Sequence, residues 1–156
     1  MSLVLTRLLQ EDFTDWERLV SAYEEENKRL PVPAENNPST LHRFNVAISD
    51  LYQRAQYDFA RARRNKDAIE RLIENVLKDY YRGPNEDARR GAGIQFARQY
   101  PAPDCWPTDT VDLFDLEDRF RYYYYSLQST IRILEFKAEG KITNNSLLKL
   151  ERDLVS

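Results

Sequence analysis

Residues that interrupt regular structure are scarce in this sequence of 156 residues. It contains 4 Gly and 7 Pro, and most of the prolines fall in two clusters, within residues 31–38 and 101–107. Because turn-rich β folds need frequent Gly and Pro, the long uninterrupted stretches favour helices. We therefore expect an all-α protein, with one helical domain over residues 1–156 and an irregular segment at residues 83–110.

Reactive side chains are equally rare. The chain has one histidine, His42, and one cysteine, Cys105, so it offers neither an internal disulfide nor the ligands of a closed zinc site. Gly91-Ala92-Gly93 lacks the Lys-Ser/Thr of a phosphate-binding loop and does not follow a strand. The sequence therefore predicts no enzyme, no metal site and no cofactor.

Long apolar runs are also missing. No stretch approaches the ~20 residues that cross a bilayer, and no basic-then-apolar signal pattern begins the sequence. We expect a cytoplasmic protein without a membrane partner.

Hydrophobic periodicity and the placement of breakers predict the helices. Two are long and resemble coiled-coil helices, at about residues 40–82 and 112–139, where Ser39 or Thr40 would cap the first and Gly140 would end the second. They are expected to pack as a bundle with shorter helices. These cover residues 3–30, 144–154 and, in the irregular part, 86–98; residues 100–110 are expected to form a loop.

Apolar residues recur every three or four positions along both long helices and predict a buried seam, interrupted by one charge, Lys66. A helix of about 43 residues cannot bury such a seam within itself. It needs a partner helix from the same chain or from another copy, which predicts a core or a homo-oligomer. The seam residues are Phe44, Ile48, Leu51, Phe59, Ile69, Ile73, Val76, Tyr80, Phe120, Tyr124, Leu127 and Ile131.

Positive charge is concentrated in the middle of the chain. Residues 41–103 hold 12 Lys or Arg and 8 Asp or Glu, although the net charge of the whole chain is −3. Six cations of the second helix fall within an arc of about 120°, opposite the seam, over about 42 Å. They are Arg54, Arg61, Arg64, Arg71, Lys78 and Arg82, and Arg89 and Arg90 extend the set.

Two interpretations of this cationic ridge stay open. It is either a solvated face with intrahelical pairs, such as Asp67 with Arg71 and Glu74 with Lys78, or a binding track for an anionic polymer. Residues 122–125, four tyrosines in succession, are similarly open: they favour core or subunit packing, and those that face outward could stack on bases.

The predicted second helix ends in Lys78-Asp79-Tyr80-Tyr81-Arg82-Gly83. This resembles the Asp-Tyr-Tyr-x-Gly that closes the long helix of the UvsY family of bacteriophage recombination mediators, and the order of helices is similar over most of the chain. The family carries two basic residues just before this motif that serve DNA binding. The matching positions here hold Asn75 and Leu77, so the nearby cations Arg71, Lys78 and Arg82 would have to substitute for them.

The resemblance implies a homo-oligomeric ring that binds single-stranded DNA and helps a RecA-like recombinase displace the single-strand-binding protein. If the chain is phage-encoded, it would act in the host cytoplasm. The alternative hypothesis is a helical assembly or adaptor protein that binds only protein, such as a phage scaffold, a chaperone or an inhibitor of host defence.

Overall fold

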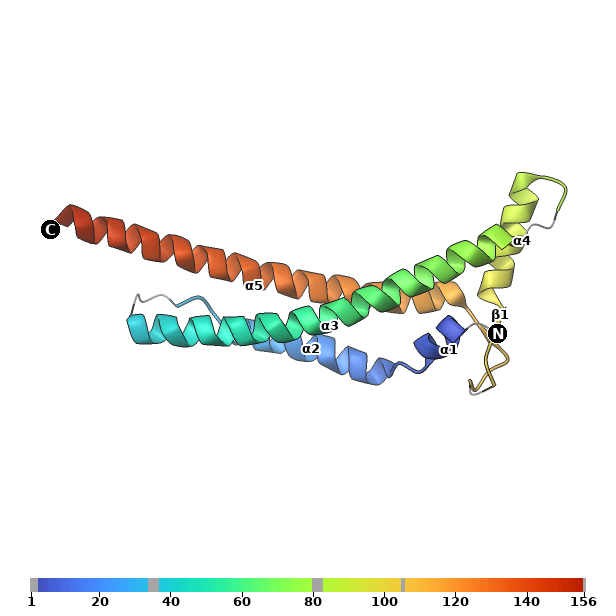
Figure 1. The fold of residues 1–156 in the computed structure, drawn as a ribbon, viewed down its shortest axis with the longest axis horizontal. Coiled ribbons are helices and arrows are strands. Elements are labelled where there is room, and N and C mark those ends of the chain that lie inside the picture. Colours follow the sequence, from blue (N-terminus) through green and yellow to red (C-terminus); the bar gives the residue numbers. More distant parts are fainter. Residues whose placement is uncertain (1–2, 34–36, 80–82, 105, 156) are drawn as a thin grey trace. The chain divides into compact units, whose positions relative to one another are not determined.

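The computed structural model describes residues 3–33, 37–79, 83–104 and 106–155, and for residues 141–155 it describes the helical backbone. Within these residues the chain forms five helices and one pair of short strands, which confirms the all-α expectation (Figure 1). In chain order the elements are α1 (Leu3–Leu9), α2 (Phe13–Lys28), α3 (Pro38–Asp79), α4 (Glu86–Arg98), β1 (Tyr100–Pro101), β2 (Thr110–Val111) and α5 (Leu113–Val155).

The expected first helix, residues 3–30, is in fact two helices. Asp12 separates them, because its carboxylate accepts a hydrogen bond from the backbone N–H of Asp15 at 3.0 Å and its carbonyl accepts from the N–H of Trp16 at 3.0 Å. Side-chain acceptance of this kind is an N-cap, which starts a new helix. The apolar periodicity continues across the break, so periodicity alone did not reveal it.

The start of α3 also differs from expectation. Asn37, and neither Ser39 nor Thr40, caps the helix: its side-chain oxygen accepts from the N–H of Ser39 at 2.9 Å and its carbonyl from Leu41 at 2.9 Å. Pro38 then occupies the first helical position, where the missing N–H costs no hydrogen bond. The expected helix at residues 86–98 is present as α4, capped by Asn85, whose side chain accepts from Ala88 at 2.8 Å.

The expectation that Gly140 ends the third long helix is wrong. Instead, α5 continues to Val155 and absorbs the short helix expected at residues 144–154. One glycine inside a helix costs only about 1 kcal/mol, and no proline follows it to force a stop. The expected loop at residues 100–110 contains a further difference, since Tyr100 pairs with Val111 and Pro101 with Thr110 in an antiparallel ladder.

The chain folds as two compact units. The first comprises Met1–Trp16 and Arg61–Tyr124. Its core is apolar and aromatic: Trp16 stacks on Tyr123 with ring centroids 5.5 Å apart, and Phe13 packs against Phe120 at 5.7 Å. Its fully buried residues also include Leu5, Leu8, Ile69, Leu113 and Ala97.

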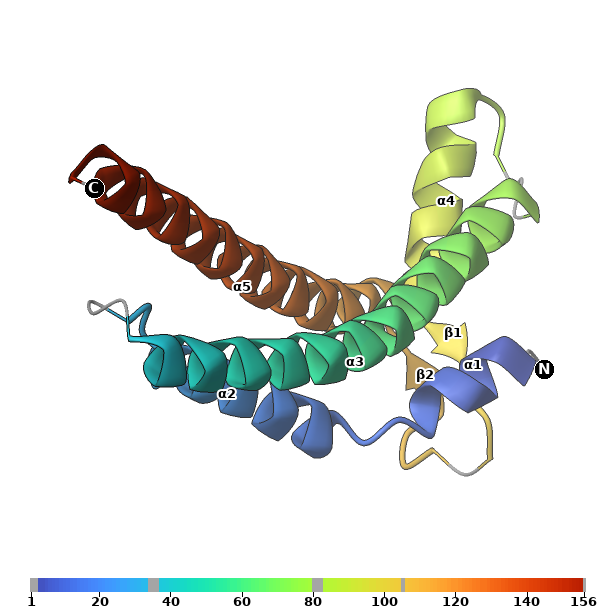
Figure 2. The ribbon, with the colours of Figure 1, turned by 60° about the vertical axis from the view of Figure 1, so that its left-hand side comes forward.

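The second unit comprises Glu17–Ala60 and Tyr125–Ser156. Figure 2 shows the second half of α2 lying along the first half of α3. A lysine closes the end of α2, because the ammonium of Lys137 donates to the carbonyl oxygens of Asn27 at 2.6 Å and Leu30 at 2.8 Å. The Asn27 carbonyl also accepts from the backbone N–H of Leu30 at 3.2 Å, and burial of the ammonium lowers the pKa of Lys137.

Most of the predicted seam is buried. Phe59 and Tyr124 are half-buried, and Tyr80 lies outside the described residues. Among the tyrosines of α5 the deepest is Tyr123, at 1% exposure, because it is the residue that stacks on the indole of α2. The remaining seam residues are all buried: Phe44, Ile48, Leu51, Ile69, Ile73, Val76, Phe120, Leu127 and Ile131.

A buried hydroxyl ties α2 to α3 in the second unit. The Tyr23 hydroxyl donates to the Asp58 carboxylate at 2.6 Å. Burial, together with this hydrogen bond and the negative charge of Asp58, raises the pKa of Tyr23 above its usual value. The folded chain therefore retains this proton at a pH where the unfolded chain loses it.

We predict that Tyr23→Phe lowers the free energy of unfolding by about 2 kcal/mol at pH 7, since a hydrogen bond to a charged acceptor is lost. Above a pH of about 10 the unfolded tyrosine ionises while the folded one does not, so wild-type stability falls there. The loss of stability that comes from ionisation of Tyr23 should be absent in Tyr23→Phe. Urea denaturation between pH 7 and 11 measures both effects.

Tyr57→Phe is the matched control, because Tyr57 is a helical tyrosine on α3, next to Asp58, and is exposed. It should leave stability at pH 7 unchanged. Equal stabilities for Tyr23→Phe and Tyr57→Phe would contradict the assigned role of the buried hydroxyl.

Candidate functional site

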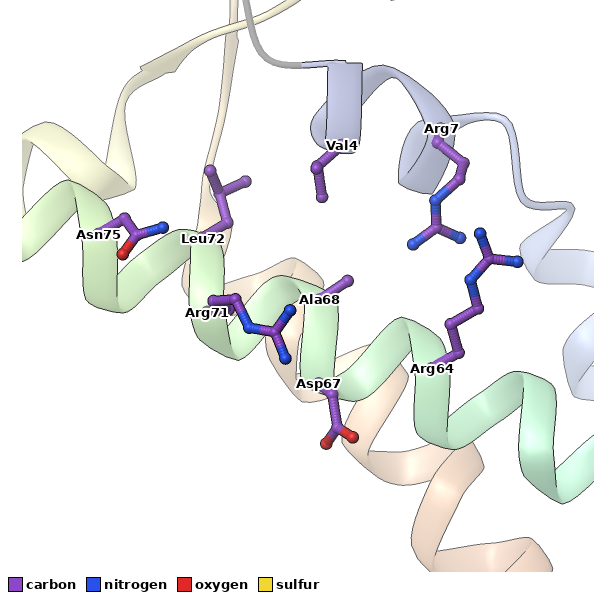
Figure 3. A pocket seen from close by; sticks show the side chains of 8 residues that line it. All are labelled: Val4, Arg7, Arg64, Asp67, Ala68, Arg71, Leu72 and Asn75. Atoms are coloured by element: carbon purple, nitrogen blue, oxygen red, sulfur yellow. The ribbon is translucent and has the colours of Figure 1, made fainter.

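A groove between α1 and α3 in the first unit gathers three arginines (Figure 3). Arg7 comes from α1, and Arg64 and Arg71 come from α3, two turns apart; we call this site the arginine groove. Figure 3 shows Arg7 and Arg64 extending toward one another, whereas the carboxylate of Asp67 points away from both. The cavity has a volume of about 510 Å³ and is also lined by Val4, Ala68, Leu72 and Asn75.

Arg7 is held in place by a buried amide. Its guanidinium donates to Oδ1 of Asn65 at 3.1 Å, and Nδ2 of Asn65 donates to Glu11 at 3.1 Å. Asn65 is 2% exposed, yet both ends of its side chain are hydrogen-bonded, as a buried amide requires. This pairing fixes α1 against α3 and sets the position of Arg7 in the groove.

Glu11 has further partners that occupy Arg61. Its second carboxylate oxygen accepts from the indole N–H of Trp16 at 2.9 Å and lies 3.7 Å from the guanidinium of Arg61. The same guanidinium lies 4.7 Å from the centroid of the Trp16 ring, a cation–π distance. Arg61, predicted to bind DNA, is therefore engaged within the fold.

Arg54 is likewise paired. It lies 3.0 Å from Asp50 and 3.1 Å from Glu26. Burial by itself lowers the pKa of Arg54, but the hydrogen bond to Asp50 and the charge of Glu26 outweigh it and raise the pKa. Carboxylates therefore neutralise the Arg54 end of the predicted ridge.

Arg64 and Arg71 have no carboxylate partner among the residues that the structure describes. The intrahelical pairs weighed for this face, Asp67 with Arg71 and Glu74 with Lys78, are both absent from that part of the chain. The ion-pair partner of Asp67 is Lys66, at 3.8 Å. No described carboxylate therefore neutralises the charge of Arg64 and Arg71.

The remaining predicted cations are distributed around the other end of α3. Lys78 is exposed, and Arg89 and Arg90 of α4 line a separate cavity of about 320 Å³ with Leu77 and Glu86. Arg82 lies outside the described residues. The structure thus brings together two of the eight predicted residues in one groove and adds Arg7.

One feature of the sequence is related to the hydrogen bonds of Asn65 that position Arg7. The predicted seam ran from Ala62 through Lys66 to Ile69, but the fold buries Asn65, three residues after Ala62 and four before Ile69. A polar residue at a buried helical position needs a partner. Nothing in the sequence pointed to Arg7 itself, because it lies on another helix, away from the apolar side.

Comparison with known proteins gave no match. No family model matches the sequence, no curated protein matches it, and no solved structure matches the fold. The motif behind the resemblance to the UvsY family includes Tyr80, Tyr81 and Arg82, which lie outside the described residues.

Two other kinds of site were considered over the described residues. No group of three or more His, Cys, Asp or Glu side chains there could hold a metal ion. No helix in that part of the chain combines the length and apolarity needed to cross a membrane. His42 is exposed, and Cys105 lies outside the described residues.

We predict that Asn65→Ala destabilises the protein by about 2–3 kcal/mol, because Glu11 loses a donor and Arg7 an acceptor in a partly buried setting. Asn75→Ala, the same substitution at an exposed position of the same helix, should change stability by less than about 0.5 kcal/mol. Urea denaturation followed by circular dichroism compares the two. Similar midpoints would show that the network does not secure α1.

Proposed function

We propose that this protein binds single-stranded DNA through the arginine groove and catalyses no reaction. The observation that carries the proposal is the geometry of Arg64 and Arg71, which lack carboxylate partners among the described residues and share one groove with Arg7. Three like charges in one site repel one another, so an anionic ligand relieves the repulsion.

Phosphate is an anion whose geometry fits guanidinium groups well. The planar donor fork of arginine makes paired hydrogen bonds to phosphate oxygens, which a lysine ammonium cannot do. Each phosphate contact also releases counterions from the strand, and this release favours binding at low salt. The proposal thus replaces the 42 Å ridge expected from the sequence with a short groove.

The resemblance to the UvsY family extends this proposal to recombination. In that role the protein helps a RecA-like recombinase load onto a strand covered by single-strand-binding protein. Because Asn75 and Leu77 stand where the family has basic residues, Arg7, Arg64 and Arg71 supply the charge here. This part of the proposal depends on the resemblance alone.

We predict that the double variant Arg64→Gln/Arg71→Gln weakens binding to a fluorescent single-stranded oligonucleotide by at least about tenfold at 50 mM salt. The slope of log affinity against log salt should become shallower by about 1.4, or about 0.7 for each lost phosphate contact. Fluorescence anisotropy over a salt series measures both quantities.

Arg43→Gln/Arg132→Gln is the matched control. Both residues are exposed, neither lines the groove, and the change in net charge is identical. This control should bind like the wild-type protein. The proposal is wrong if the two double variants lose affinity equally, or if the wild-type protein does not bind at all.

A second candidate function is self-assembly, favoured by an exposed apolar face on α5 in the second unit. Tyr125, Ile133 and Phe136 fall within an arc of about 80° at 100° per residue. Phe136 is 74% exposed and Ile133 is 46% exposed. Exposed apolar patches of this kind mark interfaces in soluble proteins, and a second copy of the chain would cover this one.

We predict that Ile133→Ser/Phe136→Ser raises the dissociation constant of any homo-oligomer by at least about tenfold, since large buried side chains dominate interface energies. Light scattering across a concentration series measures it. The control Val46→Ser, an exposed apolar position on α3, should leave the assembly unchanged. An unaltered particle mass in the double variant would exclude this face as the interface.

A further inference from the structure

We infer that a second cavity, adjacent to the arginine groove, takes one unstacked nucleobase of the bound strand. This inference rests on the proposed function and specifies which part of the ligand each cavity receives. We call the second cavity the aromatic pocket. It has a volume of about 510 Å³ and is lined by Leu72, Asn75, Val76 and Asp79 of α3, Phe96 of α4, and Tyr100 and Pro101 of β1.

Two aromatic rings form one side of the aromatic pocket. Phe96 and Tyr100 meet edge to face, with ring centroids 5.6 Å apart and planes at 68°. Both side chains are half-buried, and Phe96 has a further interaction within the fold. Ring faces of this kind support stacking by any base, irrespective of its sequence.

The aromatic pocket and the arginine groove are neighbours along α3. Leu72 and Asn75 line both cavities, so the two cavities are adjacent. Arg71 and Val76 are five residues apart, which is about 7.5 Å along the helix axis. A phosphate held by Arg71 and the base attached to the same or the next nucleotide can therefore occupy the two cavities together.

Charge assigns the two halves of a nucleotide to different cavities. The arginine groove contains three guanidinium groups and one carboxylate, Asp67, which is paired with Lys66. Among the described residues that line the aromatic pocket, Asp79 is the only charged one. A phosphate is attracted by the first cavity and repelled by the second. A neutral base is not repelled by the apolar pocket, and the Asp79 carboxylate can accept a hydrogen bond from an amino group on its edge.

This arrangement selects single strands. In a duplex the faces of the bases are stacked on one another and are unavailable to an aromatic side chain. A duplex therefore satisfies only the arginine groove, whereas a single strand satisfies both cavities. The preference for single strands follows from Phe96 and Tyr100, and the dependence on salt follows from the arginines.

The experiment compares three ligands of equal length: a single-stranded 12-mer, the same 12-mer with abasic sites in place of its bases, and the corresponding duplex. Fluorescence anisotropy at fixed salt measures their affinities for the full chain. The wild-type protein should bind the normal strand about tenfold more tightly than the abasic strand. In Tyr100→Leu, which keeps apolar volume and removes the ring, that ratio should fall below about twofold.

The outcomes separate this inference from the proposed function. Equal binding of normal and abasic strands by the wild-type protein, with the loss in Arg64→Gln/Arg71→Gln retained, overturns the aromatic pocket and leaves the arginine groove standing. Failure of all three ligands to bind overturns both. If Tyr100→Leu does not fold, the wild-type comparison of normal, abasic and duplex ligands decides the matter by itself.

Discussion

The length of α3 is the constraint on which the rest of the structure depends. A helix of 42 residues exposes its apolar seam unless other segments cover it along its whole course. In the first unit α1 and the start of α5 supply apolar side chains such as Leu5 and Phe120, and in the second unit α2 and the later part of α5 supply Val20 and Leu127. Because these elements gather at the seam, the opposite side of α3 is left to charged side chains, and function is to be sought there.

The buried hydrogen bonds of Asn65 determine how α1 and α3 form the arginine groove. Packing of Leu5 and Leu8 would hold α1 near α3 with little preference for register. The amide of Asn65 removes that freedom, since it is satisfied only when Arg7 and Glu11 stand on either side of it. A buried polar group that lacks its partners is costly, so the network specifies one position for α1. The third guanidinium of the arginine groove is placed by this requirement.

The sequence predicted those features that depend on local pattern and missed those that depend on partners. The presence of one long helix at α3, the bounds of α4 and most of the seam follow from periodicity and the placement of breakers. The break before Phe13 needed the side-chain geometry of Asp12, and the continuation of α5 past Gly140 depended on the small penalty of a single glycine. The ridge of cations was visible as a stripe, but which of its members are neutralised depends on Glu11 and Glu26, acids from other helices. The position of Arg7 could not be predicted from the sequence, because it depends on how α1 packs against α3.

The distinction between paired and unpaired arginines decides how the charged side of α3 is interpreted. Arg54, Arg61, Arg64 and Arg71 share one side of a helical wheel. Arg54 and Arg61 form ion pairs with acids, whereas Arg64 and Arg71 form none among the described residues. An exposed ion pair contributes at most about 1 kcal/mol, so the paired arginines are small structural terms. Arg64 and Arg71 share a groove but form no ion pair that would stabilise the fold. The repulsion between their charges lowers the stability of the folded state. Such a cost is typical of binding sites, where a ligand of opposite charge offsets it.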